Sequence, residues 1–165
     1  MKNKPELALN LGVGMDYQES TPEIQWVNID CIREFRADLY RDLHQHLPYL
    51  DFSVDHIKAK DIIEHFTKYE IPIVFKDWVR VLKKDGTIEV TTPNIEAIKS
   101  FSGETLLNLI FGESLFSGVQ TGYFGIHKWA FTSESLRNLF TENGLDVIEL
   151  KPSDGTNLYC LGRKV

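Results

Sequence analysis

The stretch LALNLGVGMDYQESTPEIQWVNID, residues 7–30, decides the fold class of this chain. It opens with a nearly continuous apolar run that ends at Gly12 and Gly14, the pattern of a strand buried on both faces of a parallel sheet. A second apolar run, residues 26–30, predicts the next strand and ends in the carboxylate of Asp30. The residues between the runs are too few and too polar for a full covering helix. We therefore expect two buried strands whose carboxyl ends carry two glycines and an aspartate.

The composition predicts one folded domain over residues 1–165, because 42% of the residues are hydrophobic and 25% are charged. The net charge of −6 gives no general attraction for phosphates, so neither a nucleic acid nor a membrane surface is an expected partner. No apolar run approaches the roughly 18 residues that span a bilayer. The first six residues, MKNKPE, contain no apolar signal core. We therefore expect a cytoplasmic protein.

The rest of the chain alternates predicted strands with predicted helices. The clearest helix is expected at residues 71–82, where apolar side chains recur at steps of three and four. A second helix is expected from its N-cap Thr132 to residue 143, and Gly144 ends it. Further strands are expected at residues 37–43, 54–60 and 87–92, and a closing hairpin at residues 145–151 and 157–164 across the turn Asp154-Gly155. Residues 94–123 are less regular and predict an inserted helical or lid segment.

This alternation predicts an α/β fold, because parallel neighbouring strands need crossover connections. The expected architecture is a Rossmann-like, mostly parallel seven-stranded sheet, and the closing hairpin forms an antiparallel edge. In such a sheet, ligands bind beyond the carboxyl ends of the strands. Asp30, Asp42 and the pair Lys60-Asp61 all lie at such ends, as do the two glycines.

The glycine pair taken alone is equally compatible with a tight turn that binds no ligand. Asp30 follows at the position from which a carboxylate accepts hydrogen bonds from both hydroxyls of a ribose. A dinucleotide fold is disfavoured, because Tyr17 replaces the third glycine of G-x-G-x-x-G and no helix is predicted after it. A nucleotide-binding protein with another chemistry therefore stays only a third alternative.

Five ordered blocks give a more specific signal than the glycines. They are LNLGVG, WVNID, RDLHQHLPYLDFSVDHIKAKDIIEHF, VFKDWVRVLKKDGTIEVTTPN and HKWAFTSESLRNLFTENGLDVIEL. In order and spacing they resemble the class I S-adenosylmethionine-dependent methyltransferases, and the short first loop resembles the compact type 11-like branch. The resemblance implies S-adenosylmethionine as cofactor and methyl transfer to a small-molecule or glycan-type acceptor. A non-catalytic binding module or partner subunit is the alternative.

The resemblance also implies roles for individual residues. Cofactor binding is assigned to Leu11, Gly12, Gly14, Asp30, Cys31, Asp42, Leu43 and Lys60. In this assignment the glycines lie under the methionine part, Asp30 binds the ribose, and Asp42 and Leu43 lie beside the adenine. Lys60 departs from expectation, because a cation repels a sulfonium, so it points away, pairs with Asp61 or binds an anionic acceptor.

Three residues are candidates for a general base on the acceptor side: His127, Asp61 and His65. His65 matches the histidine of the LEH turn that is common in this branch, and a structural role is favoured for it. For His127 a base and a packing residue are equally open. The pair His44 and His46 lacks a third ligand at a recognisable spacing, so no metal site is expected.

The chain is short of the helices that cover one face of the sheet in the wider family. Six residues precede the first strand, and the next two connections are too short or too polar for a full helix. We expect reduced helices on that face, and an exposed apolar sheet is unfavourable in a monomer. Either residues 94–122 fold across that face or a second subunit covers it, and the sequence predicts the second arrangement, a homodimer.

Overall fold

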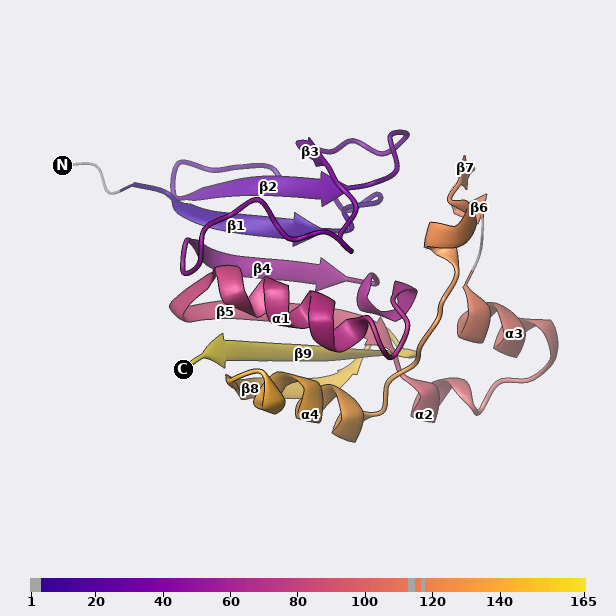
Figure 1. Cartoon of the computed structure of the whole chain (residues 1–165). Coiled ribbons are helices and arrows are strands. Elements are labelled where there is room, and N and C mark those ends of the chain that lie inside the picture. Colours follow the sequence, from indigo (N-terminus) through magenta and orange to yellow (C-terminus); the bar gives the residue numbers. More distant parts are fainter. Residues whose placement is uncertain (1–3, 113–114, 117) are drawn as a thin grey trace.

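The computed structural model describes residues 4–112, 115–116 and 118–165. A seven-stranded sheet with the order β3-β2-β1-β4-β5-β9-β8 forms its centre (Figure 1). Its strands are β1 (Glu6–Leu11), β2 (Ile24–Asp30), β3 (Leu39–Tyr40), β4 (Val54–Lys60), β5 (Leu82–Pro93), β8 (Leu145–Ser153) and β9 (Asn157–Lys164). The strands from β3 to β5 pair in parallel, whereas β9 pairs antiparallel with both β5 and β8. The predicted fold class, including the antiparallel edge hairpin, is confirmed.

Two helices pack on the same face of this sheet (Figure 1). They are α1 (Ile71–Val81) and α4 (Ser133–Glu142). Thr132 caps α4 as predicted: its side chain accepts a hydrogen bond from the Ser135 N–H, and the Ser135 hydroxyl accepts one from the Thr132 N–H. Gly144 follows with a φ of 74°, the left-handed conformation that ends a helix.

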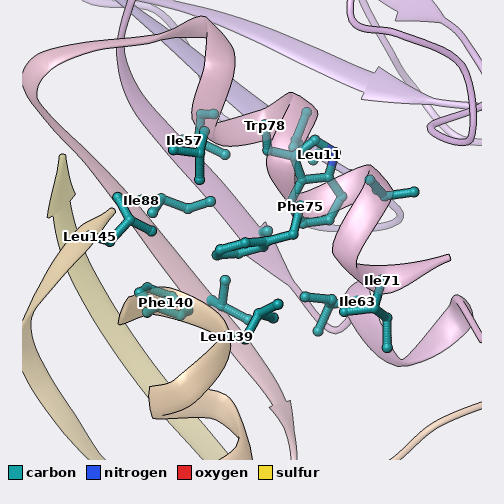
Figure 2. Packing of buried hydrophobic residues seen from close by; sticks show 14 of the residues in the cluster. Leu11, Ile57, Ile63, Ile71, Phe75, Trp78, Ile88, Leu139, Phe140 and Leu145 are labelled. Atoms are coloured by element: carbon teal, nitrogen blue, oxygen red, sulfur yellow. The ribbon is translucent and has the colours of Figure 1, made fainter. Parts of the chain in front are cut away.

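The hydrophobic core lies between these helices and the sheet (Figure 2). The Phe75 ring from α1 and the Phe140 ring from α4 have centroids 5.1 Å apart, and Trp78 lies 6.1 Å from Phe75. All three side chains are buried. The helices thus pack against one another as well as against the sheet, and this joins the parallel half to the closing hairpin.

No helix covers the opposite face in the part of the chain that the structure describes (Figure 1). That face carries polar pairs: His56 with Thr87, Tyr159 with Glu89, and Lys58 with Asp16. Strand alternation turns Ile57 and Ala59 toward the core and His56 and Lys58 away from it. The expectation of reduced helices is confirmed, but the expectation of an exposed apolar face is wrong. The homodimer prediction therefore loses its original reason and stays untested.

The described parts of residues 94–125 lie beyond the carboxyl ends of the parallel strands (Figure 1). They form α2 (Ile95–Ile98), α3 (Gly103–Phe111), β6 (Leu115–Phe116), β7 (Val119–Gln120) and the 3-10 helix η2 (Gly122–Gly125), and the predicted segment also includes 113–114 and 117, outside the described residues. A second 3-10 helix, η1 (Ile63–His65), follows β4. Among the helices described, none is long and apolar enough to cross a membrane.

Asp77 of α1 holds the connection between β3 and β4 against the helix. Its carboxylate accepts hydrogen bonds from the Leu47 N–H at 2.7 Å and from Arg80 Nε at 2.8 Å, and His46 Nδ1 lies 2.6 Å away. Burial acts to raise the pKa of Asp77, but these hydrogen bonds outweigh it and hold the pKa below its ordinary value. The charged form of Asp77 therefore stabilises the fold.

We expect Asp77→Asn to lower the free energy of unfolding at neutral pH by about 3 kcal/mol, the cost of breaking a buried pair. The folded pKa lies below the unfolded value of about 3.9. The stabilisation by the Asp77 carboxylate is therefore complete above the unfolded pKa of Asp77 and is lost as the pH falls through its folded pKa. Urea unfolding at a series of acidic pH values measures it. Asp51→Asn, which changes the 61% exposed partner of the same Arg80, should cost under about 1 kcal/mol. Equal effects of the two variants would contradict this account.

Candidate functional site

A cavity of about 650 Å³ lies at the carboxyl ends of β1, β2 and β4. Its volume falls in the range of about 300–1,000 Å³ that is typical of small-ligand pockets. The predicted residues that line it are Gly12, Gly14, Asp30, Cys31, Asp42, Leu43, Lys60, Asp61, His65 and His127. Leu11 does not line it, because its side chain is buried in the core below. Residues from five connections of the sheet thus meet at one cavity.

Gly12 and Gly14 both have left-handed backbone conformations, with φ values of 66° and 47°. A Cβ atom at Gly12 would lie 2.6 Å from side-chain atoms of Ile62 in the connection after β4, so packing against that connection favours glycine there. A Cβ atom at Gly14 would meet no atom within 4 Å. Only Gly14 therefore leaves open space at the cavity wall.

Asp30 connects two loops at the end of β2. Its Oδ2 atom accepts a hydrogen bond from the Gly14 N–H at 2.9 Å, and its Oδ1 atom accepts one from the Ile32 N–H at 2.8 Å. Each carboxylate oxygen can accept more than one hydrogen bond, so both keep capacity for a ligand. The side chain is nearly buried at the cavity wall, which makes it a fixed acceptor pair.

The wall after β3 combines a charge with apolar surface. Burial acts to raise the pKa of Asp42, but hydrogen bonds from the His44 backbone and ring outweigh it and lower the pKa. Leu43 lines the same part of the cavity. Sequence reasoning missed further apolar lining residues, among them Val13, Met15, Ile32, Phe35, Ile62 and Phe66. Their apolar character is no signal by itself, because core residues have the same character.

Cys31 follows Asp30 and lines the cavity as a neutral thiol. Burial raises the pKa of Cys31 to about 11, and the nearby Asp30 and Asp42 carboxylates add to this. A thiol that stays protonated is a weak nucleophile. The position is thus suited to packing against a ligand and not to covalent chemistry.

Lys60 is the last residue of β4 and Asp61 follows it, and both line the cavity. The Asp61 backbone is left-handed, with a φ of 50°, and its Oδ1 atom accepts a hydrogen bond from Asn157 Nδ2 at 3.0 Å. Desolvation by the surrounding protein raises the pKa of Asp61, while the Lys60 charge lowers it less. Within the described residues no ion pair joins Lys60 to Asp61, and the Lys60 side chain is exposed. The pairing that was one alternative for Lys60 does not form.

His65 and His127 meet at the cavity wall with ring centroids 5.1 Å apart. His65 Nδ1 lies 3.2 Å from the Ile126 carbonyl, which ties η1 to the segment after η2. Lys128 strengthens this tie, because its Nζ donates a hydrogen bond to the His65 carbonyl at 2.8 Å. Burial lowers the pKa of both imidazoles, that of His65 to about 4. Both rings are therefore neutral near pH 7, and His65 is too weak a base to hold a proton there.

Glu64 is a site residue that sequence reasoning missed. Its side chain is fully buried, its Oε2 atom accepts a hydrogen bond from the Thr92 hydroxyl at 3.0 Å, and its Oε1 atom has no hydrogen-bond partner among the described residues. Burial, followed by the Asp61 charge, raises the pKa of Glu64 to about 8. The available signal was an acidic residue directly before His65 in the turn IEHF.

His44 and His46 do not converge. The Nδ1 atom of His44 lies 2.7 Å from Asp42, whereas that of His46 lies 2.6 Å from Asp77. Each ring therefore serves a different carboxylate.

The structure is similar to those of several known proteins. A SAM-dependent methyltransferase from Archaeoglobus fulgidus matches with a TM-score of 0.69 and 13% identity, over 97% of this chain and 86% of that chain. A chain of the complex between the Trm112 methyltransferase activator and a methyltransferase from Haloferax volcanii matches with a TM-score of 0.65 and 16% identity, over 97% of this chain and 83% of that chain. The 1,6-didemethyltoxoflavin-N1-methyltransferase of Burkholderia thailandensis, with S-adenosylhomocysteine bound, matches with a TM-score of 0.63 and 12% identity, over 98% of this chain and 72% of that chain. No protein-family model and no curated protein matches the chain.

Proposed function

We propose that this chain, which has the fold of the class I S-adenosylmethionine-dependent methyltransferases, binds S-adenosylmethionine and transfers its methyl group to a small-molecule or glycan-type acceptor. The observation that carries the proposal is the meeting of Gly14, Asp30, Asp42 and Asp61 at one cavity of about 650 Å³. These residues come from the ends of different strands, as expected for a ligand site in an open parallel sheet.

The donor and acceptor groups at the cavity fit the parts of this cofactor. Asp30 has spare acceptor capacity for the two ribose hydroxyls, and Asp42 is held ionised to accept a hydrogen bond from the adenine amine. Leu43 and Phe35 offer apolar surface to the adenine ring, and the open backbone at Gly14 leaves room for the methionine part. When bound, the cofactor supplies an electrophilic methyl group on a sulfonium.

The residues of the chain then have the task of aligning an acceptor. His127 and Asp61 line the cavity, and the neutral imidazole of His127 can hold a proton or orient a hydroxyl. Lys60, exposed and without an ion-pair partner among the described residues, is available to an anionic acceptor. His65 is assigned a positioning role, because its ring holds the loop that carries His127.

Isothermal titration with S-adenosylmethionine, S-adenosylhomocysteine and NAD tests the cofactor. Binding of the first two, without NAD, is the expected result, and binding of NAD alone would overturn the proposal. Methyl transfer to hydroxyl, amine and carboxylate acceptors then separates an enzyme from the alternative, a non-catalytic binding module or partner subunit. Lys60 lines the cavity, and its charge would repel a sulfonium bound there, which favours this alternative.

Assembly is a separate part of the proposal. The homodimer stays our proposal, and exposed apolar side chains on α3 and η2 now support it, among them Leu107, Phe111, Tyr123 and Phe124. The Haloferax volcanii protein pairs instead with the Trm112 activator, which is a different kind of partner. The mass measured by sedimentation at micromolar concentration tests the homodimer, and a mass of 19.0 kDa, that of one chain, would reject it.

The two glycines are expected to respond differently to alanine. Gly12→Ala should destabilise the fold by about 2–3 kcal/mol, because a strained φ and a clash with Ile62 add. Gly14→Ala should lower the free energy of unfolding by only about 1 kcal/mol, the cost of its strained φ. Its methyl group enters the cavity, however, and should weaken cofactor binding. Urea unfolding and cofactor titration on both variants measure this contrast. A reversed order of the two stability losses would contradict it.

A further inference from the structure

We infer that Glu64, His65 and His127 form a binding site for a first-row divalent transition-metal ion at the wall of the cavity. One ligand atom from each residue lies within 4.8 Å of those of the other two. Glu64 and His65 are neighbours in η1, whereas His127 follows η2, so the fold brings two distant segments together. Two imidazoles and one carboxylate are a donor set that Zn²⁺, Fe²⁺, Co²⁺ and Mn²⁺ bind, whereas Mg²⁺ and Ca²⁺ favour oxygen ligands.

The buried Glu64 carboxylate is the observation that points to a ligand. Its side chain has 0% exposure, and its Oε1 atom has no hydrogen-bond partner among the described residues. That Oε1 atom lies 4.0 Å from His127 Nε2, so it is the carboxylate oxygen close to an imidazole. A buried polar atom without a partner is unfavourable, and most such atoms in native structures are satisfied. A cation between Glu64 and the two rings would satisfy it.

The backbone fixes both imidazoles in a form suited to a metal. His65 Nδ1 lies 3.2 Å from the Ile126 carbonyl, and His127 Nδ1 lies 3.2 Å from the Leu109 carbonyl. A carbonyl oxygen only accepts hydrogen bonds, so each Nδ1 carries the proton and the second ring nitrogen keeps its lone pair. Metal-bound histidines commonly donate their other N–H to a backbone carbonyl in this way.

The neighbouring charges act in opposite directions. Asp61 adds negative charge close to Glu64, which favours a cation. Lys128 adds a positive charge, since its Nζ donates a hydrogen bond to the His65 carbonyl. The Lys128 ammonium also lies 3.6 Å from the centroid of the Tyr123 ring, which partly compensates its charge. The charges of Asp61 and Lys128 thus oppose each other, and the donor atoms of Glu64, His65 and His127 themselves provide the affinity for a cation.

The site faces the cavity, because His65 and His127 line it while Glu64 lies behind them. A metal held by these three residues has coordination positions left for a ligand from the cavity. Its use in catalysis rests on the proposed function and points to a hydroxyl acceptor. A metal-bound hydroxyl loses its proton to water at lower pH, its oxygen forms the bond to the methyl carbon, and the carbon–sulfur bond breaks with its electron pair staying on sulfur.

Titration of Zn²⁺ and of Co²⁺ into the chelator-treated full chain, with no cofactor or acceptor, tests the site. We expect one equivalent per chain and visible Co²⁺ absorption from nitrogen and oxygen ligands. His65→Asn and His127→Asn should each weaken binding by more than about 100-fold, because loss of even a supporting partner costs 10–100-fold. Glu64→Gln keeps the side-chain volume and should weaken binding as strongly while the protein stays folded by circular dichroism.

His46→Asn is the matched control, because it removes an exposed imidazole outside the cluster and should leave metal binding unchanged. Absence of stoichiometric binding, or binding unaffected in folded Glu64→Gln and His127→Asn, would overturn the site. A loss of binding in His46→Asn with binding kept in His127→Asn would overturn it as well. S-adenosylmethionine titration into the metal-free protein tests the proposed function separately, so failure of one proposal is distinguishable from failure of the other.

Discussion

Replacing Asp30 by alanine is expected to weaken S-adenosylmethionine binding by about 100-fold, or about 3 kcal/mol, the value of one or two hydrogen bonds to a charged group. The carboxylate now holds the Gly14 loop and the Ile32 loop through its two oxygens. Its removal takes away the proposed ribose acceptor and also loosens both walls beside it. Isothermal titration measures the affinity, and S-adenosylhomocysteine should show the same loss because it carries the same ribose.

Glu34→Gln is the matched control for Asp30→Ala. Glu34 is an exposed carboxylate in the same connection and does not line the cavity, so its loss changes net charge equally. We expect its effect on affinity to be less than about threefold, as for a screened surface charge. Circular dichroism and thermal unfolding establish that Asp30→Ala remains folded. An affinity for folded Asp30→Ala within threefold of the unchanged protein would contradict the ribose assignment.

Replacing Phe75 by alanine is expected to lower the free energy of unfolding by about 3–5 kcal/mol. The ring is fully buried, lies 5.1 Å from the Phe140 ring, and is one of the contacts that join α1 to α4 (Figure 2). Its removal leaves a cavity between two helices and the sheet, which cannot collapse without moving all three. Chemical unfolding measures the loss.

Ile73→Ala on the same helix is the control for Phe75→Ala. Ile73 is 69% exposed, so its truncation should change stability by no more than about 0.5 kcal/mol. Similar losses for the two variants would mean that helix propensity, and not burial between α1 and α4, decides the cost.

Much of the architecture could be predicted from local sequence patterns. The α1 stripe, the Thr132 cap and the Asp154-Gly155 turn each depend on a few neighbouring residues, and the structure has all three. The third strand shows the limit: residues 37–43 were expected, but β3 is only Leu39–Tyr40. Just two residues of this edge strand find a register with β2, and a propensity pattern does not report where pairing stops.

The sequence by itself determined the order of strands and helices and the groups at the strand ends, because periodicity, caps and turn residues act over a few residues. It did not determine what the uncovered sheet face presents. Alternation along paired strands sets Lys58 and Glu89 on that face, and this depends on register across the sheet. Only the tertiary structure decided that the buried Glu64 and His127 lie 4.0 Å apart, because their approach depends on how a distant loop packs over η1.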